Sequence, residues 1–407
     1  MRILFCCEYY APSFGGVQKV IQEIAEHLVK RGHNATVATT KLRERDFDEL
    51  NGVRIREFKV SGNLVRGLEG ELEAYRKFVT SEPFDVIVIK AAQQWTFDAL
   101  WPVLSQITHR KVHIPCGYSS LHEPAYRDYY QQMPEILRQF DHLIFYATSY
   151  RDIDFAKLCS ITNYSVIPNG ASEIEFAEPP RVDFRKKYGI GNEDFVFLTV
   201  GHPRFQKGQL EVAQAYERAD LSGSSVLILN DRPNGDNVLG SATFPDKLKS
   251  LPLSLMNQYR YPLKDFRRAL KRIRRQHGKT AVVTNLERED VISAYFASDL
   301  FVFASHVEYS PLVLFESAAA GLPFLSVPVG NASEIAAWTQ GGEICPAECN
   351  VKGDVVVDPK ILAKRMEAMA SCRERLEKYG KRGRDNWKEK YSWDKIALQY
   401  EQVLMDR

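Results

Sequence analysis

Two glutamates eight positions apart, Glu308 and Glu316, are the residues best placed to do chemistry. The apolar run 299–305 that precedes them predicts a buried strand of a parallel sheet. We therefore expect Glu308 in a loop at the carboxyl edge of that sheet. Ser310 and Pro311 then predict the start of a helix, as a cap followed by a proline in the first turn.

The amino end of this helix offers free backbone N–H groups and the positive end of the helix dipole, which suits a phosphate. The helix is predicted to end at 321–323, Gly-Leu-Pro. Glu316 lies about one and a half turns into it, too far from the start to interact favourably with the dipole. Hydrogen bonding to a ribose would explain a carboxylate at this position.

A second loop combines two cations with two glycines. The run 194–200 predicts a buried strand, and the segment from Gly201 to Gly208 follows it, with Arg204 and Lys207 between the glycines. Cations at the end of a strand would neutralise the charge that builds up on a leaving nucleoside diphosphate. The alternative is a solvated basic turn.

A third loop ends in a pair of glycines, Gly15 and Gly16, just before the predicted amphipathic helix 17–30. A backbone without side chains can approach a phosphate closely. A tight turn alone is the alternative. The dinucleotide-binding fingerprint is absent, because no third glycine follows at the required spacing.

The string 308–323 resembles the two-glutamate signature of retaining glycosyltransferases of family 4, which have the GT-B fold. The resemblance implies that Glu308 lies against the donor sugar and that Glu316 binds the nucleotide ribose. It also implies that the residues between them bind the donor diphosphate: Ser310, Pro311, Leu312 and Val313. An ordinary strand-turn-helix with two surface acids is the alternative.

The cationic loop adds to the resemblance. Lys207 and Gly208 match the family's loop, whereas the family's arginine is replaced by His202, and Arg204 lies two positions further on. The resemblance therefore implies Lys207 as a catalytic cation, Arg204 as the substitute for the arginine, and His202 as a donor-binding residue.

Two more loops acquire a role by resemblance. The Gly15–Gly16 pair matches a loop that faces the donor phosphate across the cleft of these enzymes. The loop 285–290 matches one whose backbone reads the nucleotide base, and Leu286 is the residue we expect there.

The acceptor is expected near the loop that follows the predicted strand 112–115. This region is rich in polar and aromatic side chains, and we expect His113, Tyr118 and His122 to bind the acceptor. Such side chains can equally line a solvent-exposed helix. Many family members place a histidine in this loop where the chain has Cys116.

The order of the elements predicts an α/β protein. Strands alternate with helices in two runs that separate near residue 172. The resemblance implies the GT-B fold: two Rossmann-like doubly wound domains that face each other across a cleft. We expect an acceptor domain at 1–172, a donor domain at 173–390, and a C-terminal helix, 391–407, that packs back on the first domain.

Composition narrows the function further. The net charge of +2, from 54 basic and 52 acidic residues, argues against a dedicated nucleic-acid binder. Seven scattered cysteines suit a reducing compartment and form no zinc-ligand set, so we expect no metal site. The chain enters a strand directly after Met1, and no apolar run of about 18 residues occurs, so we expect neither a leader nor a membrane span.

One stretch stands apart in charge: residues 264–279 hold eight Lys and Arg in a helical sequence. Contact with an anionic membrane surface or a lipid diphosphate acceptor would use such a stretch. A solvated helix face is the alternative.

The resemblance to family 4 implies a retaining hexosyltransferase that moves a sugar from a UDP- or GDP-linked donor to a glycan or lipid-linked acceptor in surface polysaccharide biosynthesis. Such chemistry needs no cofactor and no metal, and the leaving phosphate takes the acceptor's proton. We expect a cytoplasmic protein, peripheral at the inner face of the cell membrane. The alternatives are a sugar-nucleotide epimerase of the same fold and a non-catalytic nucleotide-sugar-binding protein.

Overall fold

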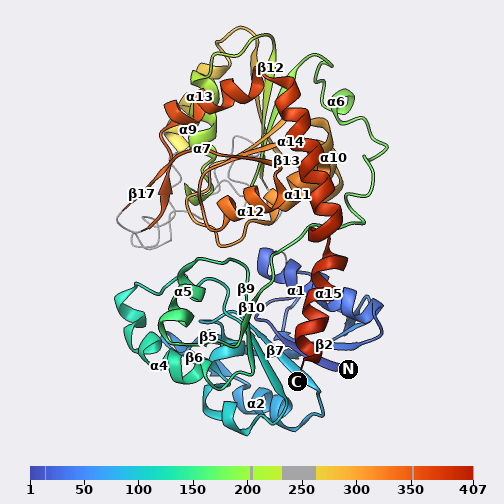
Figure 1. Ribbon diagram of the computed structural model, residues 1–407, viewed down its shortest axis with the longest axis vertical. Coiled ribbons are helices and arrows are strands. Elements are labelled where there is room, and N and C mark those ends of the chain that lie inside the picture. Colours follow the sequence, from blue (N-terminus) through green and yellow to red (C-terminus); the bar gives the residue numbers. More distant parts are fainter. Residues whose placement is uncertain (14, 202–204, 232–262, 351–352, 407) are drawn as a thin grey trace. The chain divides into compact units, whose positions relative to one another are not determined.

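The computed structural model describes residues 1–13, 15–201, 205–231, 263–350 and 353–406. The chain divides into two compact units (Figure 1). Unit 1 comprises Met1–Asn169 and Tyr391–Arg407, and unit 2 comprises Gly170–Lys390. The segment 230–262, which holds several Gly, Pro and Asn residues, lies outside the described residues from 232 onward.

Unit 1 is built on a sheet with the strand order β10-β9-β8-β7-β1-β2-β4-β3, in which the pairing is parallel except between β3 and β4. A separate hairpin, β5 with β6, lies beside it. The strands are β1 (Arg2–Cys6), β2 (Asn34–Thr40), β3 (Glu49–Leu50), β4 (Val53–Phe58), β5 (Val60–Asn63), β6 (Gly67–Gly70), β7 (Val86–Lys90), β8 (Arg110–Ile114), β9 (His142–Phe145) and β10 (Tyr164–Val166).

Helices cover this sheet because its central strands are apolar on both faces; every residue of β7 is buried. The helical elements of unit 1 are α1 (Gly16–Lys30), α2 (Leu72–Ser81), α3 (Trp95–Asp98), η1 (Trp101–Gln106), η2 (Pro124–Tyr126), α4 (Arg127–Leu137), α5 (Arg151–Leu158) and α15 (Trp393–Met405). The C-terminal α15 packs beside α1 (Figure 1). There, Glu401 accepts from Arg31 at 2.6 Å and pairs with His33 at 2.7 Å.

Unit 2 has a parallel sheet with the order β13-β12-β11-β14-β15-β16 and a short antiparallel pair, β17 with β18. Its strands are β11 (Phe195–Val200), β12 (Ser225–Asp231), β13 (Lys279–Asn285), β14 (Leu300–Phe303), β15 (Phe324–Ser326), β16 (Gly342–Ile344), β17 (Glu348–Cys349) and β18 (Val355–Val356). Its helical elements are α6 (Phe184–Lys187), η3 (Phe205–Lys207), α7 (Gln209–Arg218), α9 (Leu263–Ile273), α10 (Arg288–Ala297), α11 (Leu312–Ala320), α12 (Ala332–Thr339), α13 (Pro359–Ala370), α14 (Arg373–Asn386) and η5 (Trp387–Tyr391).

Both sheets reverse their strand order once, which confirms the predicted α/β class and the doubly wound pattern. In unit 1 the reversal falls between β1 and β7, and in unit 2 it falls between β11 and β14. The loops at the carboxyl ends of two strands that flank such a reversal diverge to opposite faces of the sheet and leave a crevice for ligands. The fold therefore predicts where each unit binds its ligand.

Two helix starts differ from the expectations. The helix after β14 begins at Leu312 with Pro311 at its N-cap, and no side chain caps it, so the capping role expected for Ser310 is wrong. Residues 288–290, expected to belong to the loop 285–290, instead form the first turn of α10, which begins at Arg288. A pattern of apolar residues marks the buried face of a helix, whereas the first turn is set by backbone geometry that the pattern does not record.

Gly208 lies where the loop after β11 packs closely against the loop after β14 in unit 2. A substitution at Gly208 therefore tests this packing. Its φ is +66°, and a Cβ there would lie 1.8 Å from the carbonyl oxygen of Ala304. Gly223 has a similar φ of +80° but nothing within 4 Å of its added Cβ. We expect Gly208→Ala to lose at least about 2 kcal/mol more stability than Gly223→Ala, because both substitutions strain the backbone but only the first creates a clash. Urea unfolding of the two variants measures the difference; equal losses would mean that the loops are not packed as described.

Candidate active site

An ion pair joins the two loops that flank the strand reversal of unit 2. Lys207 lies in the loop after β11, Glu308 lies in the loop after β14, and Lys207 Nζ is 2.5 Å from Glu308 Oε1. Neither side chain is fully covered: 31% of the lysine and 17% of the glutamate side chain are exposed. The pair thus combines a fixed positive charge with a held carboxylate where a ligand is expected.

Buried polar contacts hold these two loops together. The hydroxyl of Ser305 donates to Glu308 Oε1 at 2.9 Å and lies 2.9 Å from the carbonyl oxygen of Gln206. The backbone N–H of His306 donates to the same carbonyl at 2.7 Å. Sequence reasoning missed Ser305, because a serine at the end of an apolar strand carries no signal of its own.

The helix α11 starts directly after this pair. Ser310 and Leu312 are partly exposed, whereas Pro311 and Val313 are buried. The first-turn N–H groups of an α-helix lack partners within the helix. The amino end of α11 thus follows Glu308 closely, and the diphosphate-binding role expected for these four residues stays a prediction.

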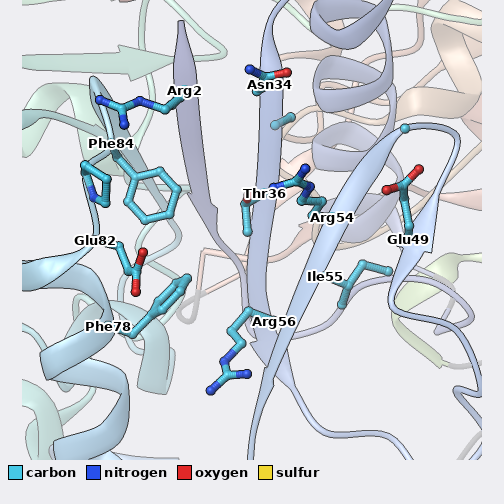
Figure 2. A pocket seen from close by; sticks show the side chains of 13 residues that line it. Arg2, Asn34, Thr36, Glu49, Arg54, Ile55, Arg56, Phe78, Glu82 and Phe84 are labelled. Carbon is cyan, nitrogen blue, oxygen red and sulfur yellow. The ribbon is translucent and has the colours of Figure 1, made fainter.

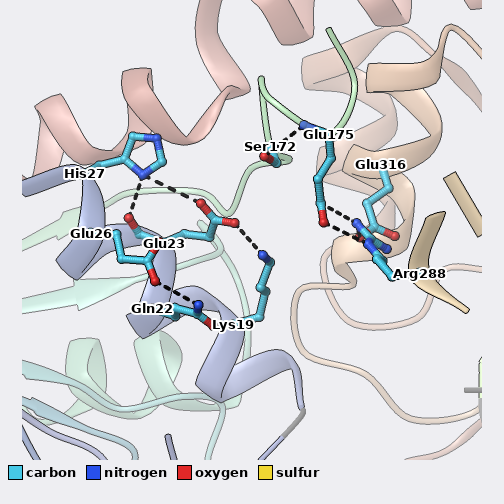
Figure 3. Close-up of polar contacts among 9 residues, drawn as sticks. All are labelled: Lys19, Gln22, Glu23, Glu26, His27, Ser172, Glu175, Arg288 and Glu316. Carbon is cyan, nitrogen blue, oxygen red and sulfur yellow. Dashed lines mark hydrogen bonds and ion pairs between the residues drawn. The ribbon is translucent and has the colours of Figure 1, made fainter. Parts of the chain in front are cut away.

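Glu316, on α11, is 7% exposed and held by two donors, of which Figure 3 shows Arg288. Arg288 Nη2 donates to its Oε1 at 2.8 Å, and the hydroxyl of Tyr295 donates to its Oε2 at 3.1 Å. Arg288 also forks onto Glu175, with Nε to Oε1 at 3.0 Å and Nη2 to Oε2 at 2.6 Å. The carboxylate is therefore oriented by its neighbours.

Sequence reasoning also missed Arg288, its partner Glu175, and Tyr295, which donates to Glu316. The sequence placed Arg288 in a loop, whereas the structure makes it the first residue of α10, where the positive end of the helix dipole disfavours a cation. An arginine in such a place needs acids around it, and Glu175 and Glu316 supply them.

The other residues expected to bind the donor are Leu286, His202, Arg204, Gly15 and Gly16. The N–H of Leu286 donates to Asn230 Oδ1 at 2.9 Å, and its side chain is buried, so this N–H is committed within the protein. His202 and Arg204 lie outside the described residues. Gly15 and Gly16 belong to unit 1, where Gly15 is the N-cap of α1 and its carbonyl accepts from the N–H of Lys19.

His113 is in the core of unit 1, so the acceptor-binding role expected for it is wrong. Its ring is fully buried and stacks on Phe97 at a centroid distance of 4.3 Å, with Phe140 at 5.1 Å. Its Nδ1–H donates to the carbonyl oxygen of Ile89 at 2.8 Å. Burial lowers the pKa of His113 to about 3, so the ring is neutral.

Tyr118 is likewise buried, at 1% exposure, with Tyr130 and Phe155 against its ring. An acceptor cannot reach this side chain, so the expected contact is wrong for Tyr118 as well. His122 is exposed and stays a candidate. A short loop segment of aromatic residues does not reveal which of its rings turn inward.

The loops after β7, which flanks the strand reversal of unit 1, and after its neighbour β8 have strained backbone. Ala91 and Gln93 follow β7, Cys116 and Tyr118 follow β8, and all four have φ between 48° and 65°. Left-handed backbone is uncommon outside glycine and concentrates at functional sites. Here the N–H of Gln93 donates to the hydroxyl of Tyr129 at 2.9 Å, which holds its loop in place.

Two carboxyl groups lie near these loops. Burial, together with the nearby Asp98, raises the pKa of Glu8 to about 7. Burial also raises the pKa of Asp98 to about 6, against the effect of hydrogen bonds from Leu64 N–H and the Tyr129 hydroxyl. Glu8 directly follows Cys7 at the end of β1, so a carboxyl that exchanges its proton near neutral pH marks this edge of the sheet. Sequence reasoning did not single out Glu8.

A pocket of about 540 Å³ opens elsewhere on unit 1 (Figure 2). It is lined by Arg2, Asn34 and Arg54, which lie at or next to the amino ends of β1, β2 and β4. The strand-reversal loops lie at the opposite ends of the strands. The pocket is therefore separate from the candidate active site.

Metal-ligand clusters and membrane-spanning helices are both missing from the part of the chain that the structure describes. No three His, Cys, Asp or Glu side chains gather there as metal ligands would. No helix in these same segments is long and apolar enough to cross a bilayer.

Known families and structures match this chain over both units. Residues 15–170 match the family "Glycosyl transferase 4-like domain", and residues 264–386 match the family "Glycosyl transferases group 1". No curated protein sequence gives a significant match.

Solved structures resemble the whole chain at low identity. Sucrose-phosphate synthase from Thermosynechococcus elongatus has a TM-score of 0.71 and 18% identity, over 99% of this chain and 98% of its own. Anabaena HepE, solved with UDP, has a TM-score of 0.72 and 15% identity, over 99% of each chain. A glycosyltransferase from Rickettsia africae has a TM-score of 0.70 and 14% identity, over 100% of this chain and 99% of its own.

Two doubly wound units, and the likeness to solved structures over the whole chain, define the GT-B fold. The two family matches make the chain a glycosyltransferase. The 4-like domain matches unit 1 and the group 1 domain matches unit 2, so both units carry a glycosyltransferase family match. The chain belongs to the family 4 type of GT-B glycosyltransferases.

The buried neutral ring of His113 makes stability depend on pH. Its folded pKa of about 3 is below the value of about 6.5 in an unfolded chain. Below pH 6.5 only the unfolded chain takes up this proton, so stability falls as pH falls toward 3. We expect the wild type to lose about 2 kcal/mol more than His113→Phe between pH 7 and pH 5, as measured by urea unfolding. The exposed His122→Gln variant is the control and should follow the wild type; equal losses in all three proteins would contradict a neutral His113.

Proposed function

We propose that this enzyme transfers a sugar, with retention of configuration, from a nucleotide-sugar donor bound to unit 2. The observation that carries the proposal is the pair between Lys207 and Glu308, 2.5 Å apart at the strand reversal and next to the start of α11. A lysine here neutralises the charge on the leaving diphosphate, and the amides of Leu312 and Val313 bind its oxygens. Glu308 positions the donor sugar.

The remaining contacts complete a donor site. Glu316 accepts hydrogen bonds from the ribose, and Arg204 and His202 supply further contacts to the donor. Solved neighbours support a nucleotide-sugar donor: HepE was solved with UDP and with UDP-glucose, and a trehalose-6-phosphate enzyme from E. coli was solved with UDP-2-fluoro-glucose. A UDP- or GDP-linked donor is therefore the proposal.

Retention is proposed because Glu308 is held rather than free. Its Oε1 accepts from both Lys207 and Ser305, so the carboxylate is committed to hydrogen bonds. Attack of the acceptor on the same face as the leaving diphosphate, which takes the acceptor's proton, needs no protein nucleophile. Because Lys207 supplies positive charge at the leaving group, no metal ion is required for this role.

The acceptor is proposed to bind the strand-reversal loops of unit 1. Glu8, the strained Gln93 and the exposed His122 offer polar groups that suit a sugar. One solved neighbour, WaaG, is described as a glycosyltransferase involved in lipopolysaccharide biosynthesis. We propose that the enzyme transfers the sugar to a glycan or lipid-linked acceptor. This reaction would belong to the biosynthesis of a surface polysaccharide at the cytoplasmic side of the membrane.

The basic helix α9 is proposed to contact an anionic membrane. Its apolar side chains Phe266, Ala269 and Ile273 are buried, and α9 packs beside α7. Its exposed face and the turn after it carry the basic residues Lys264, Arg267, Arg268, Lys271, Arg272, Arg274 and Arg275. Residues 264–279 have a net charge of +7, from eight basic residues and one acid, in a chain of net charge +2, so the rest of the chain is net −5. Such an asymmetry suits an anionic surface.

We expect Glu308→Gln and Lys207→Ala each to lower the rate of sugar transfer by about a hundredfold or more, because each removes charge or orientation at the leaving group. The exposed Glu348→Gln and Lys360→Ala variants are matched controls and should keep the wild-type rate. Transfer is measured with the nucleotide sugar that raises the melting temperature of the wild type, from a panel of UDP-, GDP-, ADP- and dTDP-sugars.

Three results would contradict this scheme. Full activity of either active-site variant would remove Lys207 or Glu308 from the site. Loss of activity in EDTA that Mg²⁺ or Mn²⁺ restores would show that a metal is required. Inversion at the anomeric carbon, read by NMR of the product, would exclude retention.

We expect the protein to sediment with vesicles of 70% phosphatidylcholine and 30% phosphatidylglycerol, and not with phosphatidylcholine alone. Replacing Lys271, Arg274 and Arg275 by Glu should weaken binding at least roughly a hundredfold, because each basic residue near the surface contributes about 1 kcal/mol. The control replaces Lys378, Lys381 and Arg382 of α14, which are equally exposed, and changes the net charge by the same amount. If the substitutions in α14 weaken vesicle binding as much as those at Lys271, Arg274 and Arg275, the net charge alone explains the effect. That result would contradict a role for α9.

A further inference from the structure

The guanidinium of Arg288 lies between two carboxylates that come from different parts of unit 2 (Figure 3). Glu175 belongs to the segment that follows the unit boundary, and Glu316 belongs to α11. Arg288 makes two hydrogen bonds to Glu175, at 3.0 and 2.6 Å, and one to Glu316, at 2.8 Å. One rigid fork thus sets the position of Glu316 from a second anchored carboxylate.

Tyr295 holds the other oxygen of the same carboxylate. Its hydroxyl donates to Glu316 Oε2 at 3.1 Å, while Arg288 binds Oε1. Arg288 and Tyr295 both lie on α10, seven residues apart, so this helix fixes both oxygens of Glu316. A carboxylate can accept about four hydrogen bonds, so binding these two donors is compatible with binding ribose hydroxyls as well.

Local forces do not explain why an arginine occupies this place. Arg288 opens α10, where the helix dipole opposes a cation. Burial alone would lower the pKa of Arg288, but Glu316 and Glu175 outweigh burial and hold this pKa above its usual range. The arrangement therefore keeps a permanent positive charge against Glu316, which favours the ionised, acceptor-only form of that carboxylate.

We propose that Arg288 is a positioning residue for nucleotide recognition: anchored by Glu175, it orients Glu316 so that the carboxylate accepts hydrogen bonds from the ribose hydroxyls of the donor. The inference rests on the proposed function, in which Glu316 meets the ribose. A purely structural role, in which Arg288 only fastens residues near Glu175 to α10, is the competing explanation. The two explanations differ in one property, the preference of the site for a ribose that carries its hydroxyls.

The test compares a nucleoside diphosphate with its 2′,3′-dideoxy analogue by calorimetric titration of the full chain. UDP and GDP are tried first on the wild type, and the nucleotide that binds is used throughout. We expect the wild type to prefer the hydroxylated nucleotide by about tenfold or more, because hydrogen bonds to a charged group are the strong ones. In Arg288→Ala this preference should fall to within about threefold, while the affinity for the dideoxy analogue stays within about threefold of the wild type.

Two further variants guard against a general loss of structure. Arg288→Lys keeps the charge but loses the fork, and Glu175→Gln weakens the anchor; each should reduce the ribose preference in part. Either variant can decide the question if Arg288→Ala does not fold. The control is Arg185→Ala, which removes another arginine of unit 2 that binds the Asp299 carboxylate and several carbonyl oxygens. It should lower the melting temperature and leave the ribose preference unchanged.

The outcomes separate the inference from the function on which it rests. If the wild type binds neither UDP nor GDP in any form, both the donor proposal and the inference fail. If the wild type binds with a ribose preference and the Arg288 and Glu175 variants keep it, the inference is overturned and the donor site stands. Loss of affinity for both nucleotides to the same extent would assign Arg288 a structural role only.

Discussion

The ion pair between Lys207 and Glu308 is the contact on which the candidate site depends. It joins two residues that are 101 positions apart in the chain. They meet because β11 and β14 are neighbours in a parallel sheet and both end at the same edge. The loops after them are then held by Ser305 and by the backbone of His306, both bound to the carbonyl of Gln206. A charged pair placed this way is oriented before any ligand arrives, which is the condition under which electrostatic stabilisation is effective.

The same principle explains the carboxylate of Glu316. A glutamate that is 7% exposed loses most of its hydration, so it needs donors to remain oriented and charged. Arg288 and Tyr295 supply them from one helix. Unit 1 shows the opposite case: Glu8 is half-buried, and burial raises its pKa to about 7. One enzyme therefore holds one carboxylate firmly in unit 2 and leaves another able to exchange a proton near neutral pH in unit 1.

Much of the fold was predictable because the buried strands and the covering helices of a parallel α/β protein each have a distinct hydrophobic pattern in the sequence. Fully apolar runs such as 86–89 favour strands covered on both faces, and amphipathic runs such as 17–30 favour helices that cover such strands. The errors arose where burial is decided by distant residues. His113 and Tyr118 look like polar groups of a ligand loop, yet Phe97, Phe140, Tyr130 and Phe155 enclose them. Nothing near these two residues in the chain records that enclosure.

By itself the sequence determined the class of fold and the order of its elements, and it singled out the glutamate and the lysine that the structure pairs. Those properties depend on local patterns: apolar periodicity, glycine and proline at turns, and a run of residues around each glutamate. Only the tertiary structure decided which side chains meet. It brought Lys207 to Glu308 and Arg288 to Glu316, and it placed His113 in the core. Contacts of this kind depend on how strands pair and helices pack, and therefore on residues far away in the chain.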